Sequence, residues 1–352
     1  MTTTKHPAKL VSFFEKAVAV NASDTHLAVG LPPIYRIYGD LHRDESEALT
    51  EAVLMEEIEK LLPDLLWKEY TDKNDIDMSY ELPSKERFRV DVYWKNGQPA
   101  LAARLIPAHI PTLEDLEAPE AVLDFVDLSQ GIVLVTGPTG AGKSTLLASM
   151  IEYINQTRPN HIVTLEDPIE FAYEAKQSLI SQRELGVDFK SFAEGLKHVF
   201  RQDPDVVLIG EMRDPDTIMT ALTLAETGHL VFATLHTNGA ASTIERVINS
   251  FPALQQQQIR LQLSLVLRGV ISQILIPSVD GKLMAAREVM VNTHAVSNTI
   301  REGKTEQLQN IIFSSSADKM QDLDQELLGL VQENRITQDT AYEYARNKKN
   351  FR

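Results

Sequence analysis

A nine-residue segment limits the fold of this chain more than any other feature of its sequence. Residues 137–145 read GPTGAGKST and directly follow Ile132–Thr136, an apolar run that predicts a buried strand. The segment fits the pattern G-x-x-x-x-G-K-[ST], which requires a strand before it and a helix after it. Its glycines let backbone N–H groups turn inward around phosphate oxygens at the positive end of that helix. It therefore predicts a phosphate-binding loop for a nucleoside triphosphate, against the alternative of a glycine-rich turn that matches by chance.

Two side chains of this loop are predicted to do more than line it. Lys143 is placed to reach the terminal phosphates, and the Ser144 hydroxyl is placed to hold Mg²⁺ bound with the nucleotide. The nucleotide contacts are assigned to Gly137, Pro138, Thr139, Gly140, Ala141, Gly142, Lys143, Ser144 and Thr145.

From residue 131 onward, short apolar runs alternate with segments of helical length. Strands that are apolar throughout are buried on both faces, which is typical of a parallel sheet covered by helices. The predicted strands are Ile132–Thr136, Ile162–Leu165, Val206–Ile209 and Leu230–Leu235. Beyond about residue 290 only helices are expected, over Ala295–Glu302, Leu323–Gln332 and Asp339–Asn347.

One of these strands leads into the first candidate catalytic acid. Val206–Ile209 is followed by Gly210, which leaves room for a close approach, and then by Glu211. An acid that ends a buried strand beside a phosphate-binding loop is placed to bind a metal or to orient water. Glu211 is therefore predicted to polarise the attacking water; the alternative is an acid that only caps the strand end.

A second strand leads into a cluster of acids. His161–Leu165 is followed by EDPIE, residues 166–170, and acids so close together repel one another unless a cation offsets their charge. A nucleotide-bound Mg²⁺ supplies such a cation, so Glu166 is predicted as a second catalytic carboxylate and as a candidate Mg²⁺ ligand. A solvated acidic loop is the alternative.

Histidines bracket the fourth strand, Leu230–Leu235. His236 follows its carboxyl end, the edge where ligands bind in parallel sheets, so it is predicted to sense the γ-phosphate. His229 precedes the strand and is the weaker candidate. For either histidine the alternative is a structural hydrogen bond.

The first 106 residues predict a separate α+β domain. Helices are expected over Leu10–Val20 and over Thr50–Leu62, where Thr50 is a candidate cap. Strands are expected over Ile34–Tyr38, Phe88–Tyr93 and Ala100–Ile106, the last two joined around the turn pair Asn96-Gly97. Three prolines mark a linker over residues 107–119, and a second domain covers 120–352.

Arginines on the predicted hairpin of the first domain are candidates for charge stabilisation. A positioned arginine accelerates phosphoryl transfer by about 10³–10⁵. Arg87, Arg89 and Arg104 lie on this hairpin, and from the residues alone they read as exposed strand positions.

Composition excludes several classes of protein. The 34 basic and 50 acidic residues give a net charge of −16, which counts against a nucleic-acid groove or a DNA translocase. The chain has no cysteine, so it has no disulfide, thiolate nucleophile or cysteine-ligated metal. No apolar run approaches the roughly 18 residues of a membrane span, and Glu15-Lys16 interrupts the N-terminal apolar stretch. The expectation is a soluble intracellular protein.

Four segments occur in an order that resembles one family. GPTGAGKST, TLEDPIE, LIGEMRDPDT and TGHLVFATLHTN are similar to the Walker A, Asp, Walker B and His boxes of the secretion-type P-loop ATPases. Ala22–Arg43 looks like the N-terminal PAS-like domain of that family. Phe251–Gln273 and His294–Lys304 resemble its pilus retraction branch, the PilT-type twitching-motility ATPases.

The resemblance implies a fold and an assembly. The fold is α/β, with an N-terminal PAS-like α+β domain followed by a RecA-like P-loop ATPase domain that has a helical C-terminal part. The assembly is a homohexameric ring that hydrolyses ATP with Mg²⁺ at subunit interfaces. Arg104 and Arg89 are then the first arginines expected to approach the nucleotide.

The resemblance also implies partners and a place in the cell. The ring would dock, as a cytoplasmic peripheral protein, beneath an inner-membrane pilus platform protein at the inner face of that membrane. A second retraction ATPase is a further candidate partner, and nucleic acid is not one.

The branch assignment rests on composition and on one motif. Pilus-extension and type II secretion ATPases carry a four-cysteine zinc module, which a cysteine-free chain lacks, so retraction fits better. The retraction signature A-I-R-N-L-I-R-E-G-K is changed at Ser297 and Thr299. An accessory retraction paralogue, a nucleotide-binding regulator, or the ATPase of a related conjugative-pilus or type IV secretion apparatus therefore stay open as alternatives.

Overall fold

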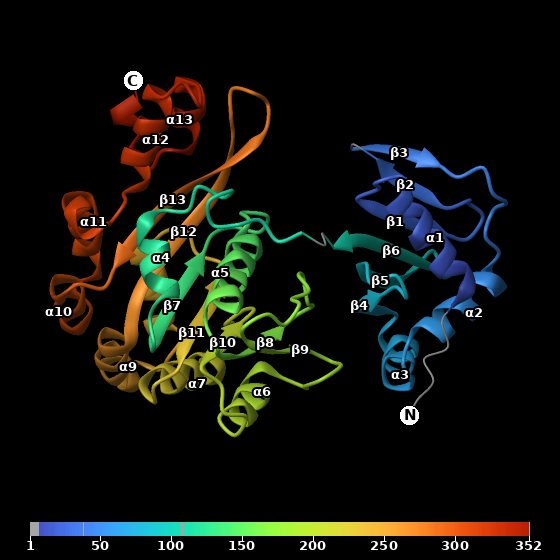
Figure 1. The fold of residues 1–352 in the computed structure, drawn as a ribbon, viewed down its shortest axis with the longest axis horizontal. Coiled ribbons are helices and arrows are strands. Elements are labelled where there is room, and N and C mark those ends of the chain that lie inside the picture. The colour runs from blue at the N-terminus through green and yellow to red at the C-terminus, as the bar shows by residue number, and fades with distance from the viewer. Residues whose placement is uncertain (1–6, 38, 107–108, 352) are drawn as a thin grey trace. The chain divides into compact units, whose positions relative to one another are not determined.

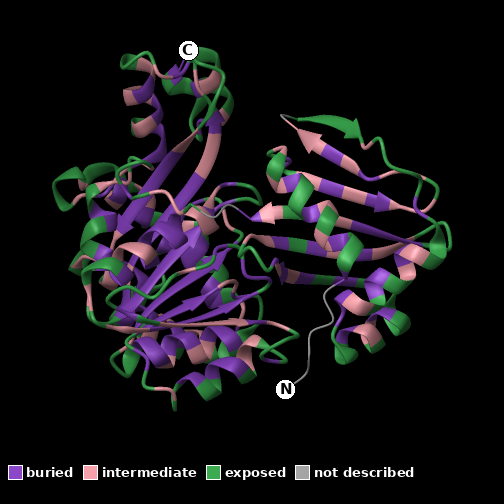
Figure 2. Ribbon diagram, turned by 45° about the vertical axis from the view of Figure 1, so that its right-hand side comes forward, coloured by how far each residue is buried: buried purple, intermediate pink, exposed green. Residues whose placement is uncertain are grey.

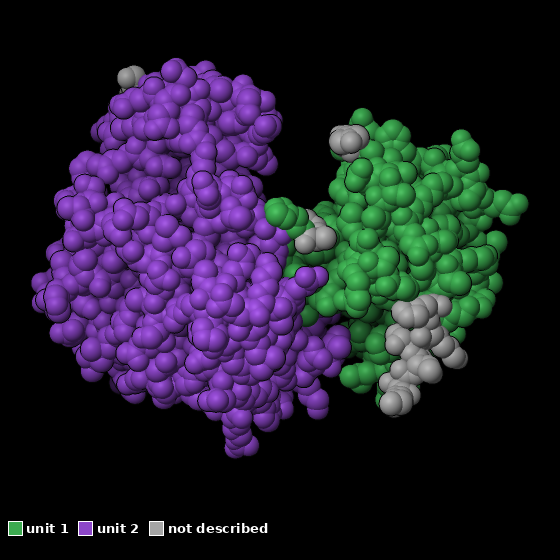
Figure 3. All heavy atoms as spheres, in the orientation of Figure 1, with its two compact units in different colours: residues 1–109, 168–172 green, residues 110–167, 173–352 purple. Residues whose placement is uncertain are grey.

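The chain folds into two compact units (Figure 3). The computed structural model describes residues 7–37, 39–106 and 109–351. Unit 1 comprises Met1–His109 with Pro168–Ala172, and unit 2 comprises Ile110–Asp167 with Tyr173–Arg352. Tyr38, at the end of a predicted strand, and Pro107, at the start of the predicted linker, lie outside the described residues.

Unit 1 is a six-stranded sheet with three helices (Figure 1). Its strands pair in the order β3-β2-β1-β6-β5-β4, and every neighbouring pair is antiparallel. The elements are α1 (Ala8–Ala19), β1 (Asp24–Ala28), β2 (Ile34–Ile37), β3 (Asp40–Arg43), α2 (Glu51–Leu61), α3 (Asp64–Lys73), β4 (Asp75–Glu81), β5 (Arg87–Lys95) and β6 (Gln98–Ile106).

One face of this sheet is buried beneath the helices. Burial alternates along β5, so Phe88, Val90 and Val92 point into the core while their neighbours face outward. Phe14 of α1 stacks on Phe88 with ring centroids 4.7 Å apart, and Ile58 of α2 joins the same apolar cluster. The expected α+β character of this region is confirmed.

Local sequence signals determine one helix start and one turn of this unit. The Thr50 hydroxyl accepts a hydrogen bond from the Val53 N–H and begins α2, as expected. Asn96 and Gly97 join β5 to β6 with φ angles of 52° and 76°, the left-handed values that a two-residue hairpin requires. The predicted hairpin is confirmed.

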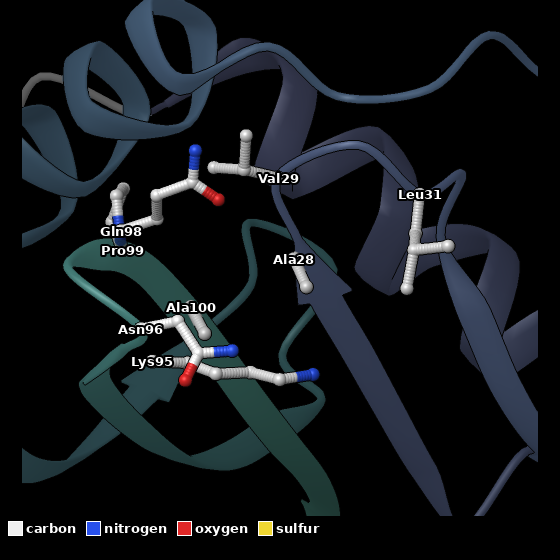
Figure 4. Close-up of a pocket in the computed structure, with 8 residues that line it drawn as sticks. All are labelled: Ala28, Val29, Leu31, Lys95, Asn96, Gln98, Pro99 and Ala100. Atoms are coloured by element: carbon white, nitrogen blue, oxygen red, sulfur yellow. The ribbon is translucent and has the colours of Figure 1, made fainter.

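A pocket of about 190 Å³ lies beside the tip of this hairpin (Figure 4). It is lined by Ala28, Val29, Leu31, Lys95, Asn96, Gln98, Pro99 and Ala100. All of these residues belong to unit 1, and none of them is among the predicted nucleotide contacts.

Unit 2 is built on a seven-stranded sheet with the order β13-β12-β7-β11-β10-β8-β9. All neighbouring pairs are parallel except β12 with β13. Its strands and first helices are α4 (Glu120–Val126), β7 (Gly131–Thr136), α5 (Lys143–Thr157), β8 (His161–Glu166), β9 (Leu179–Glu184), α6 (Phe192–Val199), β10 (Val206–Ile209), α7 (Pro215–Glu226), β11 (Leu230–Leu235), α8 (Ala240–Asn249), α9 (Ala253–Val266), β12 (Leu267–Pro277) and β13 (Leu283–Val291).

Helices cover both faces of this sheet (Figure 2). Successive residues of its inner strands point to opposite sides, so each face carries apolar side chains that pack against helices. In β7, Ile132 and Leu134 join the apolar cluster formed with α6 to α9. Val133 and Val135 join the cluster formed with α4 and α5. The four apolar runs are thus confirmed as buried parallel strands.

Three strands of this sheet were not predicted. β9 is a half-exposed edge strand of mixed polarity, LISQRE, which has no apolar run to mark it. β12 directly continues α9, so its residues read as part of one long segment. Its partner β13 forms an antiparallel ribbon with it, and such pairing is decided by contacts distant in sequence.

The chain ends in helices, as expected. They are α10 (His294–Glu302), η1 (Thr305–Gln307), α11 (Leu308–Ser314), η2 (Ser316–Asp318), α12 (Leu323–Gln332), α13 (Gln338–Tyr344) and η3 (Lys348–Phe351). The predicted helix over 339–347 ends earlier, at Tyr344, and α11 was not predicted. Within the described ranges, no helix has the length and apolar character needed to cross a membrane.

Replacing Asp91 is expected to stabilise unit 1 at neutral pH. Burial, with Asp75 and Asp77 beside it on β4, raises the pKa of Asp91 from 3.8 to about 6. The folded state therefore holds the Asp91 proton more tightly, and this contribution is lost as pH rises through about 6. Because Asp91 is partly exposed, solvent screens much of the repulsion from Asp75 and Asp77. Asp91→Asn should therefore raise the free energy of unfolding by about 1 kcal/mol at pH 7.5.

Urea denaturation at pH 5.5 and pH 7.5 measures this effect. The gain should be smaller at pH 5.5, and the exposed control Asp72→Asn should show neither change. A destabilised Asp91→Asn protein at pH 7.5 would contradict the argument.

Candidate nucleotide-binding site

The glycine-rich segment forms a tight loop between β7 and α5. Gly137, Gly140 and Gly142 have φ angles of 144°, 78° and 78°, which favour glycine. A Cβ atom at Gly137 would lie 2.1 Å from the Gln273 carbonyl oxygen, so no other residue fits there. α5 begins at Lys143, so the unpaired N–H groups of its first turn face the loop. This geometry suits a bound phosphate chain.

Lys143 lies inside the loop that it is predicted to serve. Its ammonium group donates hydrogen bonds to the carbonyl oxygens of Gly137 and Pro138, at 2.8 and 2.9 Å. The side chain is buried, with 8% of the residue exposed. Its Nζ also lies 3.4 Å from Nδ1 of His236.

His236 joins Lys143 to Glu211. His236 follows β11 and Glu211 follows β10. The two strands are parallel neighbours, so both present their carboxyl ends at the same edge. Nε2 of His236 lies 3.3 Å from Oε1 of Glu211. Because an ammonium group only donates, Nδ1 of His236 is the acceptor and Nε2 carries the hydrogen that faces Glu211. Three residues singled out separately from the sequence thus form one connected set.

Glu211 is held as a carboxylate. Burial acts to raise its pKa, but Arg213, whose NH2 lies 2.6 Å from Oε2, and His236 outweigh it and hold the pKa of Glu211 below its usual value. An ionised carboxylate accepts a hydrogen bond from water, as the predicted role requires. Arg213 was not predicted from the sequence, although its position two residues after Glu211 was a usable signal.

Gly210 lets β10 and β8 run close together where they end. A Cβ atom at Gly210 would lie 3.2 Å from the Leu165 carbonyl oxygen and 3.3 Å from Cα of Glu166. The space that a glycine leaves at this position is therefore used, as expected.

Glu166 ends β8 and is almost fully buried. Its Oε1 accepts hydrogen bonds from the Thr164 hydroxyl at 2.6 Å and from the Gln182 amide at 3.2 Å. Gln182 lies on the edge strand β9 and was not expected at the site. These two contacts orient the carboxylate.

The oxygen atoms of Ser144 and Glu166 are ligands of the kind that Mg²⁺ prefers. Ser144 lies in the first turn of α5, and Glu166 at the end of β8. Among the residues that the structure describes, no three histidine, aspartate or glutamate side chains are grouped to hold a metal ion on their own. The donors thus fit an ion that is also bound by a nucleotide.

His229 lies at the other end of β11 from His236. Its Nδ1 is 3.0 Å from the Leu224 carbonyl oxygen and 3.1 Å from the Thr227 hydroxyl. These contacts support the structural alternative for this histidine.

The three arginines of unit 1 each form an ion pair on its sheet. Arg89 of β5 lies opposite Arg104 of β6 in the ladder. Arg89 pairs with Asp77 at 2.5 Å, Arg104 with Asp24 at 2.8 Å, and Arg87 with Glu81 at 2.8 Å. Arg104 is the most exposed of the three, with 72% of its side chain accessible.

Comparison with known proteins identifies the family. The model for type II/IV secretion system proteins matches residues 13–350. The type IV pilus retraction ATPase PilT of Pseudomonas aeruginosa is 44% identical over 94% of this chain and 96% of its own. The type IV pilus ATPase PilU of the same organism is 34% identical over 96% and 90%. A crystal structure of the pilus retraction motor PilT with bound ADP superposes with a TM-score of 0.89, at 41% identity over 97% and 98%.

Removing the guanidinium of Arg213 from Glu211 is expected to change the pH dependence of ATP hydrolysis. In Arg213→Met the pKa of Glu211 should rise, because the guanidinium that lowers it is gone. Activity that needs the carboxylate is lost as pH falls through this pKa, so the acid limb of the kcat/KM profile should move to higher pH.

The exposed Arg201→Met variant is the control, and its acid limb should match that of the unmodified protein. An acid limb in Arg213→Met that stays in place or moves to lower pH would exclude Glu211 as the titrating group.

Proposed function

The chain belongs to the type II/IV secretion system protein family and is one of its ATPases, and from this premise we propose that it drives type IV pilus retraction. The connected set Lys143, His236 and Glu211 carries the proposal, since it joins the phosphate-binding loop to a water-activating carboxylate. Similarity to PilT over almost the whole chain supports retraction as the work performed.

Each residue of the site has one task in the proposed reaction. The loop 137–145 and the first turn of α5 hold the phosphate chain, and Lys143 exchanges its carbonyl partners for terminal phosphate oxygens. Glu211 orients the attacking water, and the Nε2–H of His236 holds Glu211 in place. Mg²⁺, bound with ATP and contacted by Ser144 and Glu166, would neutralise phosphate charge.

We assign Arg104 and Arg89 to charge stabilisation at a neighbouring subunit's nucleotide in a homohexameric ring. Arg89 lies on β5 and Arg104 on β6 of unit 1. Each forms an ion pair with a carboxylate, which it could exchange for a phosphate. Arg87 is the least exposed and the weakest candidate. The proposed domain boundary, a linker over 107–119 between residues 1–106 and 120–352, allows one unit to move relative to the other during turnover.

We place the ring in the cytoplasm, at the inner face of the inner membrane beneath the pilus platform protein. The net charge of −16 counts against nucleic acid as a substrate. Since PilU is related to this chain, a second retraction ATPase of the same family is a reasonable partner.

The changed positions of the retraction signature are accommodated in the fold. The Ser297 hydroxyl donates to the Ser264 carbonyl oxygen at 2.6 Å and so joins α10 to α9. Thr299 is nearly buried on the same helix. With Lys143, His236 and Glu211 all present, an active motor is favoured over a nucleotide-binding regulator.

Two substitutions test the site in the purified protein. Lys143→Ala should weaken ATP binding and hydrolysis, because the cation at the terminal phosphates is lost. Glu211→Gln keeps the shape but loses the charge, so kcat should fall by about 100-fold or more while ADP still binds. The exposed Glu194→Gln variant should hydrolyse ATP normally. Full turnover by Glu211→Gln would exclude the assigned role.

Retraction itself is tested in cells of the source organism. A strain lacking the gene should carry surface pili and fail to twitch, and the natural gene should restore motility. The Lys143→Ala form should not restore it. Normal twitching without the gene, together with lost DNA or effector transfer, would instead assign the protein to a related secretion apparatus.

A further inference from the structure

Gln273 supports the phosphate-binding loop from the side of the sheet. It lies on β12, one residue after the position paired with Thr136, the last residue of β7. Its carbonyl oxygen is the atom that excludes a side chain at Gly137, and its Nε2 would lie 2.9 Å from a Cβ atom at Gly142. The same Nε2 donates a 2.5 Å hydrogen bond to the Ala141 carbonyl oxygen. Gln273 thus bonds the loop at Ala141 and leaves no room for a side chain at Gly137 or Gly142.

Arg287 fixes the orientation of the Gln273 amide. The two residues lie directly opposite each other on β13 and β12. Nε of Arg287 donates to Oε1 of Gln273 at 2.8 Å. A guanidinium only donates and a carbonyl only accepts, so the Gln273 amide has one orientation that satisfies both neighbours. Arg287 is therefore a positioning residue for the loop, although it does not touch it.

The remaining donors of Arg287 reach residues 112–118, on the segment that leads from unit 1 into unit 2. NH2 donates to the Leu116 carbonyl oxygen at 2.9 Å, and NH1 to that of Glu117 at 3.1 Å. These carbonyls lie at the end of a single helical turn that begins at Thr112, where Asp115 and Thr112 exchange hydrogen bonds. Leu113 anchors this turn in the core of unit 2.

Arg287 is buried, with 4% of its surface exposed. Burial lowers its pKa to about 10, against the opposing effect of Glu326 and Glu117, so it stays charged at neutral pH. A buried charge is held where all its donors are satisfied, and moving it leaves them unpaired. Arg287 therefore bonds at the same time to Gln273, which supports the loop, and to the carbonyl oxygens at the end of the turn at 112–118.

We propose that Gln273 and Arg287 form a positioning relay that couples nucleotide in the phosphate-binding loop to residues 112–118. Nucleotide that shifts the loop shifts Gln273, and Arg287 transmits the shift to the segment that leads to unit 1. The relay rests on the nucleotide binding of the proposed function and not on retraction.

Nucleotide affinity gives the first test, on the full-length protein with a fluorescent ADP analogue and Mg²⁺. Gln273→Glu keeps the shape and pairs with Arg287, but a carboxylate cannot donate to the Ala141 carbonyl oxygen, so Kd should rise about 10-fold. Arg287→Met should raise Kd by a similar factor, and Arg287→Lys by less.

Arg335 provides a matched control. It also pairs with Glu117, through that residue's side chain, but bonds neither Gln273 nor the Leu116 carbonyl. Arg335→Met should therefore bind the ADP analogue with a Kd within about twofold of the unmodified protein.

The second test reads the segment directly. Because the chain has no cysteine, an exposed Glu114→Cys substitution takes an environment-sensitive dye at a single site. ADP should change the dye's fluorescence in this background and in Arg335→Met. At saturating ADP the change should be lost in Arg287→Met and in Gln273→Glu.

A role in stability alone would lower the melting temperature of these variants and leave both readouts unchanged. Folded Gln273→Glu protein with an unaltered Kd, or a dye in Arg287→Met that still responds to ADP, would overturn the relay. If Arg287→Met does not fold, Gln273→Glu and Arg287→Lys decide. Unmodified protein that fails to bind ADP would overturn the nucleotide site and the relay together.

Discussion

Parallel pairing of β7, β11, β10 and β8 is the constraint on which the rest of the structure depends. It brings the carboxyl ends of four strands to one edge, where the loop, His236 and Glu211 follow β7, β11 and β10, and Glu166 is the last residue of β8. Since each strand is buried on both faces, the sheet can exist only with helices on both sides. The position of the site therefore depends on this parallel sheet and on the helices that bury both of its faces.

Charges at this edge are balanced within the site. Lys143 is satisfied by loop carbonyls and His236, while Glu211 lies between His236 and Arg213. Each contact has a direction, because the ammonium and guanidinium groups only donate and the carboxylate only accepts. His236 is the one group that does both, with Nδ1 facing Lys143 and Nε2 facing Glu211, and this makes it the link between the loop and Glu211.

Much of this could be predicted from the sequence, where local signals decide. The apolar runs identified the four inner strands, Thr50 and Asn96-Gly97 identified a cap and a turn, and the loop pattern identified its own strand and helix. Gln273 and Arg287 could not be found in this way. Each is unremarkable in its neighbourhood, and its partner lies far away: Ala141 is 132 residues from Gln273, and Leu116 is 171 from Arg287.

The account is tested most directly by an experimental structure of the assembled protein with Mg²⁺ and a non-hydrolysable ATP analogue. It predicts the phosphates within the loop 137–145, Lys143 on the terminal phosphate, and Mg²⁺ on Ser144. It also predicts Glu211 facing the γ-phosphate, with His236 beside it. A nucleotide bound elsewhere, or a γ-phosphate out of reach of Lys143 and Glu211, would contradict it.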